Sequence, residues 1–234
     1  MSGLVARGAA LVARAACAGR EIRSLKGKSS ASARWVRRQW RDPAVKQAKR
    51  EGLRSRAALK LRELNEKHQL IARGDVVLDL GAAPGGWTQI AVEAAAPDRA
   101  KAKGDAPPSV VAVDLRAFAP VDGAAAIVGD FREPAVRREI DSRLGGRRVD
   151  VRHGAVLLGH VPGGQRGAAA ALYLRPGGHF ATKVLRCEAA EEFRAELKAR
   201  FGVVKGVKPS SSRQESTEMF LVAKGFKTAS RPQE

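Results

Sequence analysis

The stretch Val76-Val77-Leu78-Asp79-Leu80-Gly81-Ala82-Ala83-Pro84-Gly85-Gly86-Trp87-Thr88-Gln89 decides the fold of this chain. Its first five residues are largely aliphatic and contain no turn former, which predicts a buried parallel strand. Small residues form a turn directly after it, and a helical pattern then runs from Trp87 to about Ala95. In an open α/β sheet, ligands bind beyond the carboxyl end of such a strand, where a glycine-rich turn lets the backbone approach the ligand.

This turn lacks the signatures of two common nucleotide-binding loops. No Lys-Ser or Lys-Thr pair follows the glycines, so it is not a P-loop, and the spacing is not Gly-x-Gly-x-x-Gly. A strand that ends in Asp-Leu-Gly-Ala-Ala-Pro-Gly-Gly-Trp resembles instead the S-adenosylmethionine (SAM) turn of a Rossmann-like methyltransferase. The alternative is an ordinary strand-to-helix turn.

Positive charge is concentrated at the front of the chain. The 234 residues carry a net charge of +19, and residues 1–60 alone hold 16 Lys and Arg against 3 Asp and Glu. Such a basic segment favours a polyanionic partner, most often RNA or DNA. The alternative is a solvated basic face combined with a targeting peptide.

The bulk composition indicates one α/β domain with a terminal extension, because the apolar fraction of 44% suffices for a core. The chain has only two cysteines, Cys17 and Cys187, which excludes a disulfide framework and favours a reducing compartment. No apolar run approaches the roughly 18 residues that a transmembrane helix requires, so we expect no membrane association.

Residues 1–28 have the composition of a mitochondrial transit peptide. They are rich in Ala and Arg, Glu21 is their only acid, and apolar and basic residues mix at helical spacing without a long apolar stretch. We therefore expect the protein in the mitochondrial matrix. A basic RNA-binding arm and a disordered tail are the alternatives for this segment.

Residues 29–70 are predicted to form a basic helical arm. Asp42-Pro43 marks a helix start, because a capping acid precedes Pro at the first helical position, and Gly52 can end that helix. Ser55 is expected to cap a second helix, which runs from about 56 to 68.

Tryptophans and basic residues lie close together in this arm, and RNA binding uses both base stacking and phosphate contacts. We expect Trp35 and Trp40 mostly to pack the arm onto the domain, and the basic residues to bind RNA. The RNA-binding residues predicted here are Arg34, Arg37, Arg38, Lys46, Lys49, Arg54 and Arg56.

Two further predicted strands also end in acids. The strand 110–114 ends at Asp114, where a carboxylate can bond both hydroxyls of a nucleoside ribose. The strand 125–129 is followed by Asp130-Phe131, which offers an adenine one polar and one flat apolar group. The remaining patterns predict helices over 134–143 and 188–200, strands within 149–158 and over 178–185, and a hairpin-like pair over 202–207 and 217–223.

At this point the chain resembles the FtsJ-type ribosomal RNA 2′-O-methyltransferases, including the mitochondrial members that act on large-subunit rRNA. The resemblance covers about residues 30–225 and includes the turn described above. It also rests on Ser32-Ala33-Arg34-Trp35, Gly52-Leu53-Arg54-Ser55-Arg56-Ala57, Gly129-Asp130-Phe131-Arg132 and Lys183. The resemblance implies an α/β Rossmann-like fold over 71–234, with a seven-stranded, mostly parallel sheet whose last strand is antiparallel.

The resemblance also implies transfer of a methyl group from SAM to a ribose 2′-hydroxyl. The cofactor would contact residues at or just past the ends of the first three strands: Gly81, Pro84, Gly85, Trp87, Asp114, Asp130 and Phe131. The implied partners are ribosomal RNA and the large ribosomal subunit or its assembly intermediates. No metal is implied.

The active site of this family is a Lys-Asp-Lys-Glu tetrad, and its two lysines and its Glu map to Lys60, Lys183 and Glu218. A ribose hydroxyl is a poor nucleophile, so the protein must supply a base and a fixed geometry. Outside the family, Lys60 could simply pair with an acid along its helix. Lys183 is harder to explain away, because it lies in an otherwise apolar strand.

The tetrad Asp is missing. Counting back from Pro162 places it at Gly159, and no Asp follows Asp150 anywhere in the chain. The helix that normally follows the fourth strand is also expected to be short or absent, because only the segment 165–173 is available for it.

Three functions remain open on the sequence alone. The first is an rRNA-binding member of the family with lost or weak catalysis, which acts in mitochondrial ribosome biogenesis. The second is an active rRNA 2′-O-methyltransferase with a variant site, in which His160 stands in for the acid. Messenger-RNA cap 2′-O-methylation shares the tetrad, but the front end typical of a transit peptide weighs against it.

Overall fold

The computed structural model describes residues 29–96, 108–155 and 166–227. The predicted transit segment 1–28 and both Gly159 and His160 lie outside these residues. The boundaries proposed for the terminal extension and the arm therefore stay predictions.

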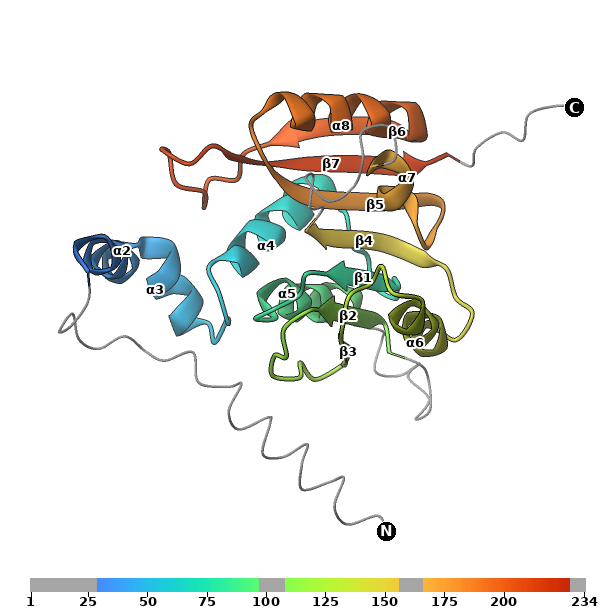
Figure 1. The fold of residues 1–234 in the computed structure, drawn as a ribbon, viewed down its shortest axis with the longest axis horizontal. Coiled ribbons are helices and arrows are strands. Elements are labelled where there is room, and N and C mark those ends of the chain that lie inside the picture. Colours follow the sequence, from blue (N-terminus) through green and yellow to red (C-terminus); the bar gives the residue numbers. More distant parts are fainter. Residues whose placement is uncertain (1–28, 97–107, 156–165, 228–234) are drawn as a thin grey trace, which may run out of the picture.

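The described chain forms one seven-stranded sheet with the order β3-β2-β1-β4-β5-β7-β6 (Figure 1). β7 runs antiparallel to both of its neighbours, whereas the printed pairs among β1 to β5 are parallel. The predicted α/β, mostly parallel sheet with an antiparallel last strand is confirmed. The strands are β1 (Val77–Leu80), β2 (Val110–Asp114), β3 (Ala124–Val128), β4 (Val149–Ala155), β5 (Leu174–Leu185), β6 (Phe201–Val207) and β7 (Glu218–Phe226).

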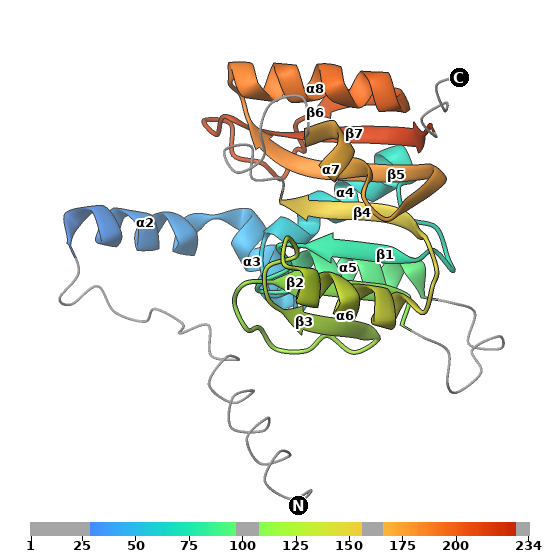
Figure 2. The same cartoon turned by 45° about the vertical axis from the view of Figure 1, so that its right-hand side comes forward.

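Helices cover both faces of the sheet, and each face has its own apolar core. The helices α4 (Ala57–His68) and α5 (Gly86–Ala95) pack on one face. On the other face lie α6 (Pro134–Leu144), α7 (Arg166–Ala171) and α8 (Glu188–Arg200) (Figure 2). The strand order reverses between β1 and β4, and in such sheets this is the point where ligands bind.

The arm begins with two helices, α2 (Ser30–Arg41) and α3 (Pro43–Arg50), which extend beyond the sheet (Figure 1). Asp42 caps α3 as predicted, since its carboxylate accepts the amide hydrogens of Ala44 and Val45. The prediction that Ser55 caps α4 is wrong. The N-cap residue is Arg56 without a side-chain cap bond, and the hydroxyl of Ser55 lies against Gly86 instead.

The described part of the helix between β4 and β5 is α7, Arg166–Ala171. Residues 156–165 lie outside the described part of the chain, so the expected short helix stays a prediction. β5 begins at Leu174, earlier than expected. Its first residues continue the pairing with β4, where Leu174 lies opposite Val149, and the guanidinium of Arg175 donates to the carboxylate of Asp150. These long-range contacts extend the strand through the Pro-Gly-Gly sequence that follows Arg175.

The expectation that the arm tryptophans pack is not met at Trp40, which is 45% exposed. None of the described helices is long and apolar enough to cross a membrane.

Candidate functional site

Three predicted catalytic residues line one cavity of about 250 Å³. Lys60 comes from α4, Lys183 from β5 and Glu218 from the first position of β7. Lys60 and Glu218 are 158 residues apart in sequence, and the sheet brings them together because β7 inserts between β5 and β6. The turn after β1 forms another wall of this cavity, which we call the lysine cavity.

Lys60 and Glu218 form an ion pair in which Nζ of Lys60 donates to Oε1 of Glu218. Burial lowers the pKa of Lys60, with further lowering by the charges of Arg56 and Lys183, although Glu218 opposes the shift. Burial raises the pKa of Glu218, but the bond and charge of Lys60 and the hydroxyl of Ser212 outweigh it, so that this pKa is lowered. Ser212 Oγ donates to Oε1 of Glu218 over 3.0 Å.

Lys183 is exposed and lies two positions before the end of β5. The register of the sheet pairs Lys183 with Ala155, the last residue of β4. Ala155 is therefore the described residue of β4 that lies opposite Lys183. Gly159, where counting back from Pro162 places the tetrad Asp, lies outside the described residues, so this placement stays a prediction.

Gly154, the residue before Ala155 in β4, has no room for a side chain. Gly154 has φ +124, and a Cβ there would lie 1.8 Å from the carbonyl oxygen of Leu80 in β1. No backbone shift confined to one residue removes such an overlap, so residue 154 must be Gly.

The predicted cofactor turn meets the lysine cavity directly. Gly81, Pro84 and Trp87 line it, whereas Gly85 is buried behind it. Gly85 adopts φ +101 and is the N-cap residue of α5, a conformation that favours Gly. The indole of Trp87 donates to the carbonyl of Ala57 over 2.8 Å, which ties the turn to α4.

Asp114 and Asp130 lie at the same edge of the sheet, since β2 and β3 are parallel neighbours. Oδ2 of Asp114 accepts the amide of Ala83 over 2.9 Å, so this carboxylate fixes the turn after β1. Asp130 bonds the guanidinium of Arg132. Phe131 packs, partly buried, against the core on the α6 side. None of these three lines the lysine cavity.

Arg54 supports the turn in a way that sequence analysis missed. Its guanidinium donates to the carbonyl oxygens of Pro84, Ala119 and Pro120. It thereby joins the turn after β1 to the loop after β2. The sequence around Arg54 cannot predict these three hydrogen bonds, because the carbonyl groups that accept them are 30 to 66 residues away.

A buried polar cluster of Asp79, Thr88 and His153, which the sequence did not predict, lies next to the lysine cavity. Oδ2 of Asp79 accepts the hydroxyl of Thr88 over 2.7 Å, and Nδ1 of His153 lies 3.3 Å from Oδ1 of Asp79. The imidazole packs edge-on against the ring of Trp87. Neither ring nitrogen has a hydrogen-bond partner within the described residues.

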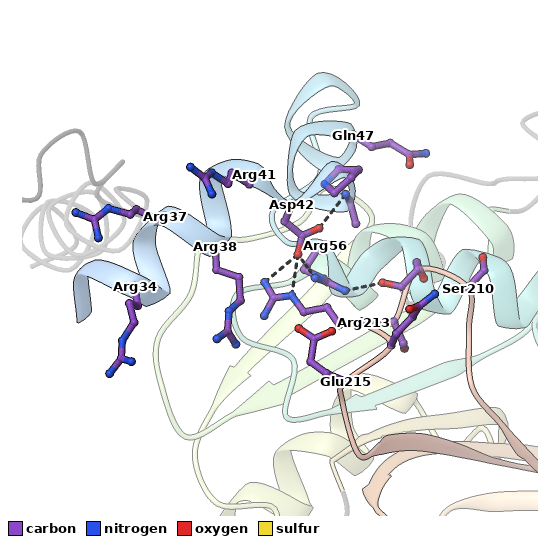
Figure 3. Close-up of a pocket in the computed structure, with 15 residues that line it drawn as sticks. Arg34, Arg37, Arg38, Arg41, Asp42, Gln47, Arg56, Ser210, Arg213 and Glu215 are labelled. Carbon is purple, nitrogen blue, oxygen red and sulfur yellow. Dashed lines mark hydrogen bonds and ion pairs between the residues drawn. The ribbon is translucent and has the colours of Figure 1, made fainter. Parts of the chain in front are cut away.

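A second, basic cavity of about 1010 Å³ lies between the arm and the loop that joins β6 to β7 (Figure 3). We call it the arginine cavity. Its centre is the carboxylate of Asp42, which pairs with both Arg56 and Arg213. Burial raises the pKa of Asp42, but the bonds and charges of these arginines and the amide of Ala44 outweigh it and lower this pKa.

The predicted RNA-binding residues divide into three groups. Arg34, Arg37 and Arg38 are exposed and line the arginine cavity. Lys46 and Lys49 are exposed on α3 and do not line it. Arg54 and Arg56 are half-buried and their guanidinium groups bond protein acceptors, among them the carbonyl of Ser211 for Arg56, which lines the arginine cavity.

Within the described residues, no cluster of three or more His, Cys, Asp or Glu side chains could hold a metal ion.

Comparison with known families identifies one that spans most of the chain. The sequence model of the FtsJ-like methyltransferases matches residues 53–153 and 167–226. The match stops at His153 and resumes at Gly167, so it leaves out the end of β4 and the segment after it. The sequence is expected to lack the tetrad acid in this same region, since no Asp follows Asp150.

Two bacterial relatives are similar over nearly the whole chain, and both are named ribosomal RNA large subunit methyltransferase E. The protein of Granulibacter bethesdensis is 37% identical over 223 residues, covering 88% of this chain and 90% of the relative. The protein of Gluconobacter oxydans is 38% identical over 217 residues, covering 88% of this chain and 77% of the relative.

Two solved structures share the fold. A protein described as a ribosomal RNA methyltransferase of Plasmodium falciparum has a TM-score of 0.55 at 23% identity, covering 74% of this chain and 98% of that chain. A protein described as a hemolysin of Lactococcus lactis has a TM-score of 0.51 at 16% identity, covering 73% of this chain and 86% of that chain. At these identities the likeness supports the architecture alone.

Proposed function

Because this chain belongs to the FtsJ-like methyltransferase family, we propose that it binds large-subunit ribosomal RNA during ribosome assembly in the mitochondrial matrix, with lost or weak methyl transfer. The observation that carries this proposal is the composition of the lysine cavity. Lys60, Glu218 and Lys183 are assembled beside the turn after β1, but the strand position next to Lys183 is Ala155.

The residues around the turn fit SAM. The turn 81–87 opens onto the lysine cavity, and Asp114, bonded to the amide of Ala83, lies at the neighbouring strand end. We assign the cofactor to Gly81, Pro84, Gly85, Trp87, Asp114, Asp130 and Phe131. SAM supplies an electrophilic methyl group, and the protein must place the ribose hydroxyl beside it and accept its proton.

Loss of the tetrad acid would weaken the acceptance of the proton from the ribose hydroxyl. Lys60 has a lowered pKa, as a general base requires, but its Nζ is already bonded to Glu218. Two lysines and two acids line the cavity, but Glu218 is bonded to Lys60 and Asp79 accepts the hydroxyl of Thr88, and the residue opposite Lys183 is Ala155. Acid–base assistance of this kind typically contributes about 10²–10⁴ in rate.

An active enzyme with a variant site is the second candidate, and one observation favours it. The Lys60–Glu218 pair and Lys183 share a cavity with the turn, so most of the machinery is retained. His160, the candidate replacement for the acid, lies outside the described residues. His153 is described, but its imidazole is fully buried beside Asp79 and Trp87 and does not line the cavity.

The RNA partner is supported by the names of the two bacterial relatives and by the exposed basic side chains of α2 and α3. The matrix location rests on the composition of residues 1–28. A fusion of residues 1–28 to a fluorescent reporter should enter mitochondria, and cytosolic fluorescence would contradict this location.

Two binding measurements on the full-length protein test the proposal. Filter binding with deproteinised large-subunit rRNA should show tight binding whose log affinity falls with log salt by about 0.7–0.9 per phosphate contact. Calorimetry should show binding of SAM. Equal affinity for rRNA and for unrelated RNA of the same length would contradict the rRNA assignment, and absence of SAM binding would contradict the cofactor assignment.

A further inference from the structure

We propose that the arginine cavity holds the phosphate backbone of a single RNA strand and leads that strand to the lysine cavity. The inference rests on the proposed binding of rRNA, and it assigns a defined path to the substrate. The side chains that line the cavity come from α2, the start of α3, Arg56 and the loop 210–215.

The charges that line the cavity are strongly unbalanced. Two acids, Asp42 and Glu215, line it. Six arginines line it as well: Arg34, Arg37, Arg38, Arg41, Arg56 and Arg213. Within the described part of the chain, the four arginines of α2 have no carboxylate partner in an ion pair. Arginines without an acidic partner at the edge of a hollow suit phosphate oxygens, because a guanidinium can donate two parallel hydrogen bonds to them.

The α2 arginines point in two directions. In Figure 3, Arg34 and Arg38 extend from the helix to the same side as Arg213 and Glu215, whereas Arg37 and Arg41 point the other way. Arg34 and Arg38 are four residues apart, so they are neighbours on one face at a rise of about 6 Å. They form the part of α2 that faces the loop.

The far wall of the cavity is held in place independently of any ligand. Arg56 and Arg213 are fixed by Asp42, and Arg56 also donates to the carbonyl of Ser211. Glu63 accepts the amide and hydroxyl of Ser210 over 2.8 and 2.9 Å. The site is therefore pre-organised, which lowers the ordering cost of binding.

The same loop also reaches the lysine cavity. Ser212 lines the arginine cavity and donates to Glu218, the partner of Lys60. A strand whose phosphates lie against Arg34 and Arg38 would continue along this loop toward Lys60. This continuity selects an RNA backbone over a free anion, because the proposed reaction needs a ribose in the lysine cavity.

Neutral donors complete the phosphate-binding character of the cavity. Gln47, Ser210 and Gln214 line it besides the arginines. Phosphate contacts in protein–nucleic acid complexes come from Arg, Ser, Gln and backbone amides. A positively charged groove that follows the backbone is the usual solution for single strands.

The test is a matched pair of double variants of the full-length protein. Arg34→Gln/Arg38→Gln removes two charges from the cavity. Arg138→Gln/Lys198→Gln removes two exposed charges from α6 and α8, on the opposite face of the sheet from α4. The probe is a fluorescent single-stranded RNA with a large-subunit rRNA sequence, measured by anisotropy across a salt series, with a duplex of the same sequence alongside.

We expect the cavity variant to bind the single strand at least about tenfold more weakly, since two charge-assisted contacts are lost. Its salt slope should fall by about 0.7 per lost contact, while the control stays within about twofold of wild type. Equal loss in both variants, or equal loss on the duplex, would overturn the inference. Wild-type protein that binds neither RNA would overturn the proposed function itself.

Discussion

At the scale of single residues, the lysine cavity depends on one buried ion pair. The side chains of Lys60 and Glu218 are 9% and 14% exposed, and the cation also lies 5.8 Å from the ring centroid of Phe220. Burying two charges is unfavourable unless each has its partner. The pair therefore couples the stability of the domain to the groups proposed for its chemistry.

Glu218→Gln should destabilise the protein by about 3 kcal/mol at neutral pH, because Lys60 is left buried without a counter-charge. Burial already lowers the pKa of Lys60, and loss of Glu218 lowers it further. The folded variant therefore favours neutral Lys60, whereas the unfolded chain favours its charged form. The loss should shrink as the pH rises toward 10.5, and denaturant unfolding at pH 7 and pH 10 measures this.

The double variant Lys60→Met/Glu218→Gln removes the buried charge altogether. It should recover most of the stability lost by Glu218→Gln, since apolar replacement of a buried pair is often neutral. A double variant as unstable as the single one would show that the loss arises from packing and not from an unpaired lysine.

At the scale of elements, Glu63 of α4 holds the loop between β6 and β7. It accepts four bonds from Ser210 and Ser211 and pairs with Lys67. Although burial acts to raise the pKa of Glu63, these bonds lower it from 4.5 to about 2. A carboxyl with a lowered pKa stabilises the fold above its unfolded value, and this stabilisation is lost as the pH falls from 4.5 toward 2.

Glu63→Gln should therefore cost at most about 3.5 kcal/mol above pH 5, given about 1.4 kcal/mol per pKa unit. The difference from wild type should disappear as the pH approaches 2. Unfolding curves between pH 2 and pH 7 measure it, with Glu139→Gln, half of an exposed helix pair, as the control. A difference that is independent of pH would refute the role of the ionised carboxylate.

The arm is joined to the same loop by Asp42. Asp42→Asn should leave the start of α3 intact, because Asn caps helices as well as Asp does, but it removes both ion pairs with Arg56 and Arg213. We expect faster amide hydrogen exchange in 43–50 and 210–215, with little change in the sheet. Unchanged exchange in both segments would mean that Asp42 acts only as a helix cap.

At the scale of the whole molecule, we expect the basic arm to bind RNA without residues 1–28. The exposed arginines of α2 lie outside residues 1–28, so deletion of 1–28 should leave rRNA affinity within about threefold of wild type. Deletion of residues 1–60 would instead remove Ala58 and Lys60 from α4 and disturb the core. Loss of rRNA binding on deletion of 1–28 would instead make that segment part of the RNA-binding surface.

Local sequence patterns predicted much of this molecule. The aliphatic run before Gly81, the Asp42-Pro43 helix start and the acids after β2 and β3 all lie where expected, because backbone propensity and capping act over a few residues. The contacts of Arg54 and the double pairing of Asp42 could not be predicted, since they join segments far apart in the chain. The strand neighbour of Lys183 could not be predicted for the same reason, because only the pairing of β4 with β5 identifies it as Ala155.

We propose that this member of the family retains the site but lacks its acid. The most direct measurement is single-turnover methyl transfer from SAM to deproteinised large-subunit rRNA by wild type, Ala155→Asp and Gly159→Asp. We predict that Ala155→Asp is at least about 100-fold faster than wild type, because it places a carboxylate beside Lys183 in the register of the sheet. Gly159→Asp should resemble wild type, and wild-type transfer as fast as that of Ala155→Asp would contradict the account.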